Sequence, residues 1–517
     1  MKRSYGFILF PAAGALFCLW YVCSATSDVV YSDYIRLINS YLPDVWNPEK
    51  FFVPDILTRI PINFLSRGIN TNLFHFSVRF DQILGILGLG LAAQVTGIYV
   101  IKERLGFGAL LAVMLLMFSL NKWEMLTNGS GWAHFLAFAC FYYYYLVLDR
   151  VWQSGKKGIR PGHKTEKPWD RPVLPEKPWD RPVLLLLPFV TTLGIAGQYC
   201  AVYSGVMIVV YGFLGIWNTF IETDGRPRTG RGADKVQHYW LWLLCILIPL
   251  ALYLISNAFT VEEHAGATEL SLIEALRQNP KFFPAFFIKS FAAMFLGGET
   301  MEGRLHLPNR VMILIGLLVM GGYLLGLWLN IKYQIYEKTL FPLLLILSGA
   351  CSHVLILISR WIFLNQENYG MSSRYAVQFQ MGIIGIVLTV AAAWKMEGRR
   401  QPRIEDTGRA LGRKAAKPLK KHSLAVILGL AFTGIILCGN IATTADEVIK
   451  APHRKERYEE KIQAALDYRN YSDEDLENIF EYRKGPEKIR QALEILETNR
   501  WNVYSHLAIE GQEGGNG

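Results

Sequence analysis

Long apolar runs with almost no charge recur along this chain of 517 residues. A run of about 18 to 21 such residues, wound as a helix, crosses the roughly 30 Å hydrocarbon core of a bilayer. The stretch 183–221 is too long for one crossing, and we expect it to turn near Gly197, Gln198 and Tyr199. The chain therefore has eleven expected spans: 6–24, 82–101, 105–120, 131–148, 183–198, 203–221, 239–259, 311–331, 340–358, 376–394 and 423–440.

Composition excludes the main alternatives. With 52% hydrophobic and 19% charged residues, the chain is too apolar for a disordered or ordinary soluble protein. The expected fold class is an all-α polytopic membrane protein with about 11 transmembrane helices, large loops on the outer face and a small C-terminal helical appendage. The net charge of +10 is concentrated in particular loops, so no nucleic-acid partner is expected.

Cysteine and histidine spacing argues against the common metal and disulfide sites. The seven Cys lie in or at the edges of apolar runs, and no two of the 10 His are three or four residues apart. This excludes a disulfide framework and a zinc site of the usual spacing. No metal ligands are predicted and no cofactor is certain, although carboxylates leave a divalent cation as an option.

Basic residues indicate which side of the membrane each loop faces. If the N-terminus is cytoplasmic, Lys and Arg outnumber Asp and Glu more than twofold in the segments on that side: 1–5, 102–104, 149–182, 222–235, 332–339 and 395–422. We therefore predict a multi-pass protein of the plasma (inner) membrane with a cytoplasmic N-terminus and an extracytoplasmic C-terminus. The apolar stretch from Gly6 to Ser24 exceeds a secretory signal core and is expected to be retained.

The segment 282–298 is apolar but is interrupted by Pro284 and Lys289. A crossing there would turn the basic loop 395–422 outward, so we expect an amphipathic or re-entrant element in the outer interface. The organisation that follows is a transmembrane bundle over 1–440, with outer loops at 25–81, 260–310 and 359–375, and an extracytoplasmic helical tail over 441–517. We interpret the tail as a packing or docking unit.

Two carboxylates follow the first span. From Tyr34 the apolar residues recur at helical spacing, and Asp33 lies on the opposite side with Arg36, which predicts a helix lying flat on the membrane surface. Asp28 and Asp33 would then lie where a lipid head group sits, and either could act as a general base. The alternative is that Asp33 only pairs with Arg36, three residues on.

Two arginines, Arg360 and Arg374, are expected at the outer ends of neighbouring spans, close to Glu367 and Tyr375. Arginines on the outer side need a partner, and a phosphate or pyrophosphate head group suits a guanidinium group. Pairing with Glu367, or contact with ordinary lipid phosphates, is an equally weighted alternative.

Glu299, Glu302 and His306 follow a Gly-Gly pair in the loop 260–310, which could form a mobile lid over a site. Ordinary solvation of a loop explains them as well. His134 and His353 lie inside apolar runs and are interpreted as packing residues.

Taken together, a carboxylate directly after the first helix, flat helices in the first loop, ten or more spans and an outward tail resemble the GT-C superfamily of polytopic glycosyltransferases. The resemblance covers the architecture of nearly the whole chain. It implies that Asp33, or secondly Asp28, is the catalytic or metal-coordinating carboxylate, and that the donor is a sugar linked to polyprenyl phosphate or diphosphate. The chain departs from the superfamily in lacking an adjacent Asp-Asp or Asp-Glu pair in its first loop, 25–81, and in lacking a WWD motif.

The resulting hypothesis is an integral-membrane glycosyltransferase working at the extracytoplasmic face. Its partners would be membrane lipid, a polyprenyl-phosphate-linked sugar and a glycan acceptor. Asp33 would be the base, and Arg36, Arg360, Arg374 and Tyr375 would bind substrate together with Glu299, Glu302 and His306. A transporter or flippase of a lipid-linked glycan, a polysaccharide polymerase or ligase, and a non-catalytic assembly subunit are the alternatives. The enzyme hypothesis predicts that Asp33 faces an outer cavity roofed by the loop 260–310 and shared with Arg374.

Overall fold

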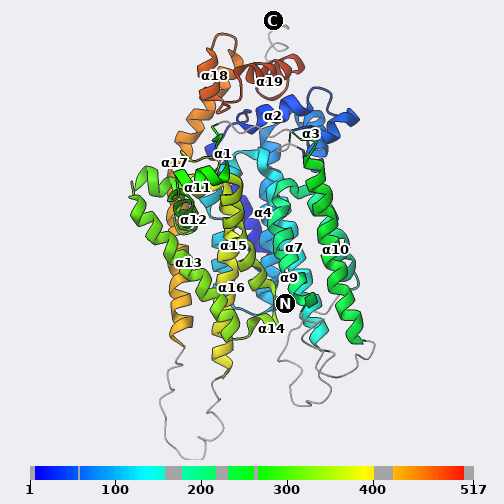
Figure 1. The fold of residues 1–517 in the computed structure, drawn as a ribbon. Coiled ribbons are helices and arrows are strands. Elements are labelled where there is room, and N and C mark those ends of the chain that lie inside the picture. Colours follow the sequence, from blue (N-terminus) through cyan, green and yellow to red (C-terminus); the bar gives the residue numbers. More distant parts are fainter. Residues whose placement is uncertain are drawn as a thin grey trace, which may run out of the picture.

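The computed structural model describes residues 6–55, 59–157, 177–216, 231–260, 266–400 and 423–505. Helices are the only regular secondary structure in these ranges, and most run side by side in one bundle (Figure 1). The long helices of the bundle are α1 (Gly6–Ala25), α4 (Val78–Lys102), α7 (Trp132–Lys157), α10 (Arg231–Asn257), α13 (Asn309–Lys332), α15 (Phe341–Arg360), α16 (Ala376–Arg400) and α17 (Leu424–Leu466). The shorter α5 (Phe107–Met117) belongs to the same bundle.

Ten helical stretches of the described residues are long and apolar enough to cross a membrane. One of them, Asp180–Ile216, folds back on itself. The hydroxyl of Tyr144 lies 2.7 Å from that of Tyr211 and 3.4 Å from the carbonyl oxygen of Leu184, so the two halves of the stretch lie at the same height. The stretch therefore contains two crossings, and the prediction of about eleven spans is confirmed.

The turn of this hairpin is where the sequence predicts it. Helix α8 (Asp180–Phe189) continues as a wider π-helical segment, Val190–Ala196, and α9 (Cys200–Ile216) leads back. Between them Gly197 adopts φ 52°, a left-handed conformation that glycine reaches without a steric penalty. A Cβ atom at this position would lie 2.9 Å from the side chain of Ile60.

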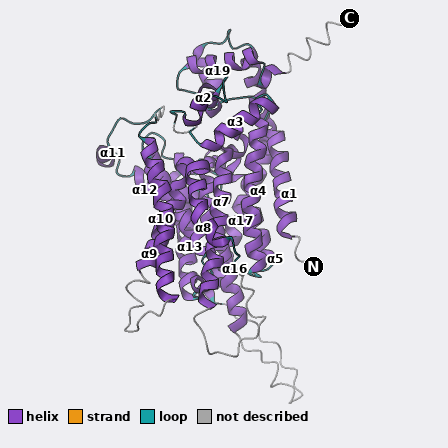
Figure 2. Cartoon of the chain, turned by 90° about the vertical axis from the view of Figure 1, so that its right-hand side faces the viewer, coloured by secondary structure: helices purple, strands orange, loops and turns teal. Residues whose placement is uncertain are grey.

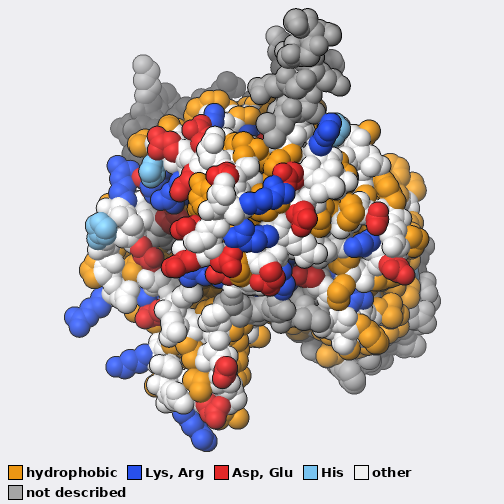
Figure 3. All heavy atoms as spheres, turned by 90° about the horizontal axis from the view of Figure 1, so that it is seen from above, with side chains coloured by type: hydrophobic (Ala, Val, Ile, Leu, Met, Phe, Trp, Pro, Cys, Tyr) orange, Lys and Arg blue, Asp and Glu red, His pale blue; other side chains and the backbone are white. Residues whose placement is uncertain are grey.

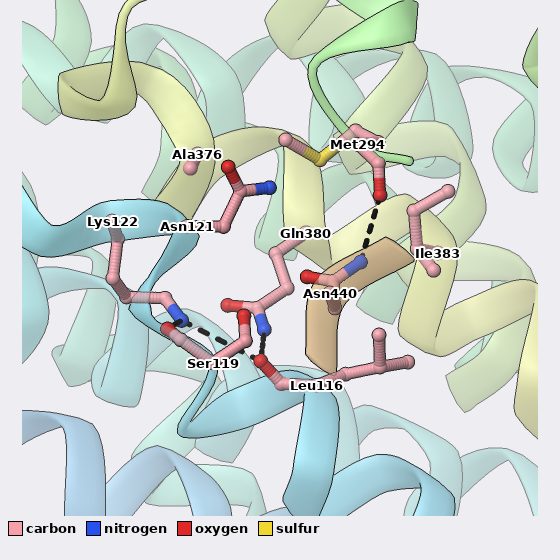
Figure 4. A pocket seen from close by; sticks show the side chains of 9 residues that line it. All are labelled: Leu116, Ser119, Asn121, Lys122, Met294, Ala376, Gln380, Ile383 and Asn440. Carbon is pink, nitrogen blue, oxygen red and sulfur yellow. Dashed lines mark hydrogen bonds between the residues drawn. The ribbon is translucent and has the colours of Figure 1, made fainter. Parts of the chain in front are cut away.

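Helix α5 stops inside the bundle, and a lysine satisfies its last carbonyl groups. Lys122 is fully buried and donates to the carbonyl oxygens of Met117 and Ser119, each at 2.9 Å. Figure 4 shows its ammonium group beside Ser119 and Leu116. Carbonyl groups at a helix C-terminus lack helical partners, which explains the buried ammonium group. Nearby, Asn121 and Asn440 donate to carbonyl oxygens at the end of α12 (Phe282–Ala292). These buried hydrogen bonds of Lys122, Asn121 and Asn440 hold α5, α12 and α17 together.

The segment around α12 does not cross the membrane. Its helix has 11 residues, about half the length that a span needs. It packs against α13 so closely that a Cβ atom on Gly316 would meet the carbonyl oxygen of Ile288. The Lys289 ammonium group is buried and forms an ion pair with Glu367 at 2.5 Å. A lysine in an apolar segment is therefore paired at the bundle end, as a re-entrant element requires.

One end of the bundle carries a cap, which consists of α2 (Asp33–Tyr41), α3 (Pro61–Phe74) and the tail helices α18 (Asp473–Ile479) and α19 (Pro486–Asn499) (Figures 1 and 2). Helix α17 has 43 residues and runs without a break from the bundle into the cap. At 1.5 Å per residue it is roughly 65 Å long, about twice the thickness of the hydrocarbon core. The expected boundary between 440 and 441 thus falls inside a continuous helix.

The first loop and the tail share a hydrophobic core that is distinct from the core of the bundle. Tyr31 and Tyr458 meet ring edge to ring face at 5.3 Å, and their hydroxyls lie 2.9 Å apart. The amide group of Asn502 donates to the carbonyl oxygen of His75 at 2.7 Å. The tail is thus a packing unit, and its partner is the loop after α1.

Helix α2 does not lie on the membrane surface with one open side. Its residues Tyr34, Ile35, Arg36, Leu37 and Ile38 are all buried, because α19 packs over the helix from the side away from the bundle. The periodicity of the sequence predicts this helix correctly. It could not show that the tail helix α19 packs against it.

Helix α3 has its polar side toward the protein interior and its apolar side outward. Its polar residues face inward: Asn63, Ser66, Arg67, Asn70 and Thr71 are buried. Leu65, Ile69 and Leu73, spaced four residues apart, are 49%, 43% and 69% exposed.

The buried face is polar because Arg67 forms an ion pair with Asp81, and both side chains are almost completely buried. The hydroxyl of Tyr34 donates to the same carboxylate at 2.8 Å, and burial next to Asp81 raises the pKa of Tyr34.

Candidate functional site

A cavity of about 530 Å³ lies where the bundle meets the cap. Its walls come from α2, the start of α3, the segment between α5 and α7, the hairpin turn, residues 360–375 and the tail. Seen from the cap end, acidic and basic side chains are intermixed over this face of the molecule (Figure 3). The cavity is therefore polar and mixed in charge, and its floor is the end of the apolar bundle.

Asp33 and Arg374 meet in this cavity. Oδ2 of Asp33 lies 3.8 Å from Nη1 of Arg374, and the two side chains are 40% and 33% exposed. Asp33 begins α2, whereas Arg374 lies in the short turn before α16, so residues more than 300 positions apart are brought together. The expectation that Asp33 faces a cavity shared with Arg374 agrees with this geometry.

Glu124 holds Arg374 in place. Oε1 of Glu124 accepts a hydrogen bond from Nε of Arg374 at 2.5 Å. Its other oxygen accepts one from the hydroxyl of Ser373 at 3.1 Å and lies 3.4 Å from that of Ser372. A charge-assisted bond of this kind is stronger than a neutral one. The turn 372–374 is therefore fixed to the short helix α6 (Trp123–Thr127), and the far side of the guanidinium group faces Asp33.

Arg360 and Tyr375 also line the cavity. Arg360 ends α15, and Tyr375 is buried against Tyr369, with the ring centroids 5.9 Å apart. Glu367, an expected partner of the two arginines, pairs with Lys289 instead. Two guanidinium groups thus reach the cavity from the ends of neighbouring helices.

Arg36 lines the cavity but pairs with another carboxylate. Its Nε atom donates to Oδ2 of Asp55 at 2.5 Å, and the arginine is almost buried. The alternative in which Asp33 pairs locally with Arg36 is therefore not what the structure shows. Pairing with Asp55 leaves the carboxylate of Asp33 directed at Arg374.

Asp28, the second candidate base, is outside the cavity. Its carboxylate accepts hydrogen bonds from the backbone amide of Val78 and the hydroxyl of Ser77, both at 2.6 Å. It also contacts the side-chain amide of Asn502 at 3.3 Å. It therefore satisfies the first amide groups of α4 and joins this helix to the tail, which is a structural role.

The described part of the expected roof, residues 260 and 266–310, contributes no lining residue to the cavity, so Glu299, Glu302 and His306 do not line it. Glu299 pairs with Arg454 of α17 at 2.8 Å. Desolvation raises the pKa of Glu302, and His306 has a left-handed φ of 46°. Residues of the tail line the cavity instead of this loop, because α17 extends from the bundle and places the tail over its end.

Other lining residues have no motif that identifies them. His134, which begins α7, lies against Tyr199 of the hairpin turn, with the rings 3.6 Å apart, and both line the cavity. By contrast, His353 is a packing residue, stacked between Phe291 and Phe379. The sequence signal for Glu124 is weak: one acidic residue in a short connection between two spans.

The carboxylates do not form a metal site. No group of three or more His, Cys, Asp or Glu suited to a metal ion occurs among the residues that the structure describes. Asp33 and Glu124 both contact Arg374, so a guanidinium group occupies the position that a cation would take between them.

The cavity places the accessible carboxylate of Asp33 next to Arg374, with Arg360 in the same lining, at one end of the bundle of candidate membrane spans. Such a set can accept a proton from a hydroxyl group and hold a phosphate. Comparison with known proteins adds no identity: no protein-family model, no curated protein and no solved structure matches the chain.

Proposed function

We propose that the protein is an integral-membrane glycosyltransferase. It transfers a sugar from a polyprenyl-phosphate-linked donor to a glycan or lipid acceptor at the extracytoplasmic face. The observation that carries the proposal is the pair of Asp33 and Arg374, 3.8 Å apart in a cavity of about 530 Å³ at the end of the bundle.

The chemistry assigns a role to each group. Asp33 accepts the proton of the acceptor hydroxyl as its oxygen forms a bond to the anomeric carbon, while the bond from that carbon to the phosphate oxygen breaks. Arg374 and Arg360 neutralise the negative charge that the leaving phosphate gains. Glu124 fixes Arg374, so the guanidinium group needs little rearrangement during the reaction. No step requires a metal ion.

The location of the cavity supports a lipid-linked donor. The cavity borders the ends of α15 and the hairpin turn, so a phosphate there can remain attached to a chain that lies in the bilayer. The excess of Lys and Arg in the segments that the sequence assigns to the cytoplasm favours an extracytoplasmic cap. Both arguments agree with a sugar donor whose phosphate sits at the outer membrane boundary.

The test compares lipid-linked and surface glycans in cells that carry the wild type, Asp33→Asn, Arg374→Ala or the control Asp44→Asn at equal membrane levels. Asp44 is an exposed carboxylate of the same loop and does not line the cavity. Transfer should fall at least about a hundredfold in Asp33→Asn, the usual contribution of a general base, with unmodified acceptor accumulating outside. The control should match the wild type.

Two results would overturn the proposal. Unchanged glycans in both cavity variants would remove the catalytic role of Asp33. A completed intermediate that accumulates on the inner leaflet would favour a transporter of a lipid-linked glycan.

A further inference from the structure

The tail forms one wall of the cavity. Six tail residues between the last turns of α18 and the start of α19 line the cavity together with Asp33: Glu477, Asn478, Glu481, Tyr482, Arg483 and Lys484. The tail is therefore more than a cover over the first loop. It belongs to the same site as the residues at the end of the bundle.

The backbone next to Asp33 is held in an unusual conformation. Ser32 has φ 51° and ψ −121°, a combination that residues other than glycine rarely adopt. Its amide group donates a hydrogen bond of 2.8 Å to the carbonyl oxygen of Phe480, at the end of α18. A strained residue persists only where its surroundings impose it. Here a tail carbonyl group satisfies the amide that this conformation presents.

Two further contacts hold α2 on either side of Ser32. The hydroxyl of Tyr458, on α17, donates to that of Tyr31 at 2.9 Å. The side-chain amide of Asn39 donates to the carbonyl oxygen of Lys488, on α19, at 2.9 Å. Three separate tail segments thus contact α2 and the two residues before it.

We propose that the tail positions Asp33 for proton transfer, through the Ser32–Phe480 hydrogen bond and the Tyr31–Tyr458 pair. Ser32 and Tyr458 are positioning residues, and neither contacts the reacting atoms. The proposal rests on the proposed function for its catalytic meaning. Its structural content, the dependence of residue 33 on the tail, can be measured without any substrate.

The substrate-free experiment follows the chemical reactivity of residue 33 in the full chain, reconstituted in lipid nanodiscs. The exposed thiols are removed by Cys23→Ser and Cys438→Ser, and Asp33→Cys provides the reporter. The rate of labelling by a charged, water-soluble methanethiosulfonate is measured for this parent and after adding Tyr458→Phe or Tyr504→Phe. Tyr504 donates to the carbonyl oxygen of Ala465 inside the tail, so it is a matched loss of a hydroxyl away from α2.

Loss of the Tyr458 hydroxyl should change the labelling rate about fivefold, the population shift that one lost hydrogen bond produces. Tyr504→Phe should leave the rate unchanged. A second pair tests the backbone: Ser32→Gly should label like the parent, since glycine accepts a positive φ, whereas Ser32→Val should not. Equal rates in all these variants would overturn the proposal.

Sugar transfer then separates the two proposals. In a chain that keeps Asp33, Tyr458→Phe should lower kcat and leave KM unchanged, because it affects the position of the base and not the affinity for the donor. If Asp33→Asn abolishes transfer but Tyr458→Phe leaves kcat unchanged, positioning by the tail is wrong and the enzymatic function stands. If Asp33→Asn leaves transfer unchanged, the enzymatic function fails, and the catalytic meaning of positioning fails with it.

Discussion

Arg374 bridges two carboxylates: its Nε atom donates to Glu124 at 2.5 Å, and its Nη1 atom lies 3.8 Å from Asp33. The two contacts are unequal. The shorter one fixes the guanidinium group, while the longer one leaves Asp33 accessible in the cavity. Because the Nε side of Arg374 is anchored by Glu124, its Nη1 side can bind a phosphate while the guanidinium group stays in position.

Replacing the anchor should therefore disturb the site without removing a reacting group. Glu124→Gln keeps the shape of the side chain but loses the charge-assisted bond, and we expect sugar transfer to fall about tenfold to a hundredfold. The measurement is initial transfer rate in membranes with equal amounts of protein. Glu302→Gln, outside the cavity, is the control, and an equal loss in both variants would contradict the anchoring role.

The buried pair of Arg67 and Asp81 should be costly to break. Asp81→Asn leaves a buried guanidinium group unpaired, and the free energy of unfolding should drop by about 3 to 5 kcal/mol. Replacing both partners, as in Arg67→Met with Asp81→Leu, should cost less, because no uncompensated charge remains. Thermal unfolding in detergent compares the variants. A double variant that is less stable than Asp81→Asn would show that the charges themselves stabilise the cap.

The hairpin turn offers a matched pair of glycines. Gly197 has φ 52° and lies against Ile60, so Gly197→Ala should lower the free energy of unfolding by about 1 to 3 kcal/mol. Gly194 has open space around its Cβ position, and Gly194→Ala should be neutral or stabilising. The unfolding midpoint in denaturant measures both. Equal effects would place the turn elsewhere.

The apolar face of α3 should contact lipid. This face continues into the exposed side of α4, through rings of Phe74 and Phe80 that stack at 4.7 Å. A nitroxide label at Leu73→Cys, in a chain lacking the exposed Cys23 and Cys438, should collide more with oxygen than with a water-soluble nickel complex. A label at Glu474→Cys, on the tail, should show the reverse order. Water-like accessibility at position 73 would contradict insertion of α3 into the leaflet.

The sequence predicts the bundle well because the signal for a span is local. Hydropathy and length locate the crossings, and because the apolar run 183–221 is too long for one crossing, they also predict the turn at Gly197. The proximity of Asp33 and Arg374 also follows from local information. Asp33 follows the first predicted span and Arg374 precedes the span 376–394, and the topology places both on the same side of the membrane.

The cap could not be predicted in this way, because its contacts join opposite ends of the chain. The periodicity of α2 shows one apolar side, but it could not show that α19, more than 440 residues away in the sequence, packs against the helix and accepts a hydrogen bond from Asn39. The sequence predicts a roof in the loop 260–310 because a Gly-Gly pair there precedes carboxylates, whereas in the structure tail residues line the cavity. Arg36 was expected near Asp33, and only the folded loop brings Asp55 to it.

The joint between Asn502 and His75 also determines when the site can exist. A ribosome makes the loop after α1 well before the tail, so Asp33 leaves the ribosome long before Phe480 is made. Until α17 and the tail have been made, the cavity lacks a wall and Ser32 lacks its partner. A nascent chain that stops before the tail would insert most of its spans and still have no complete site.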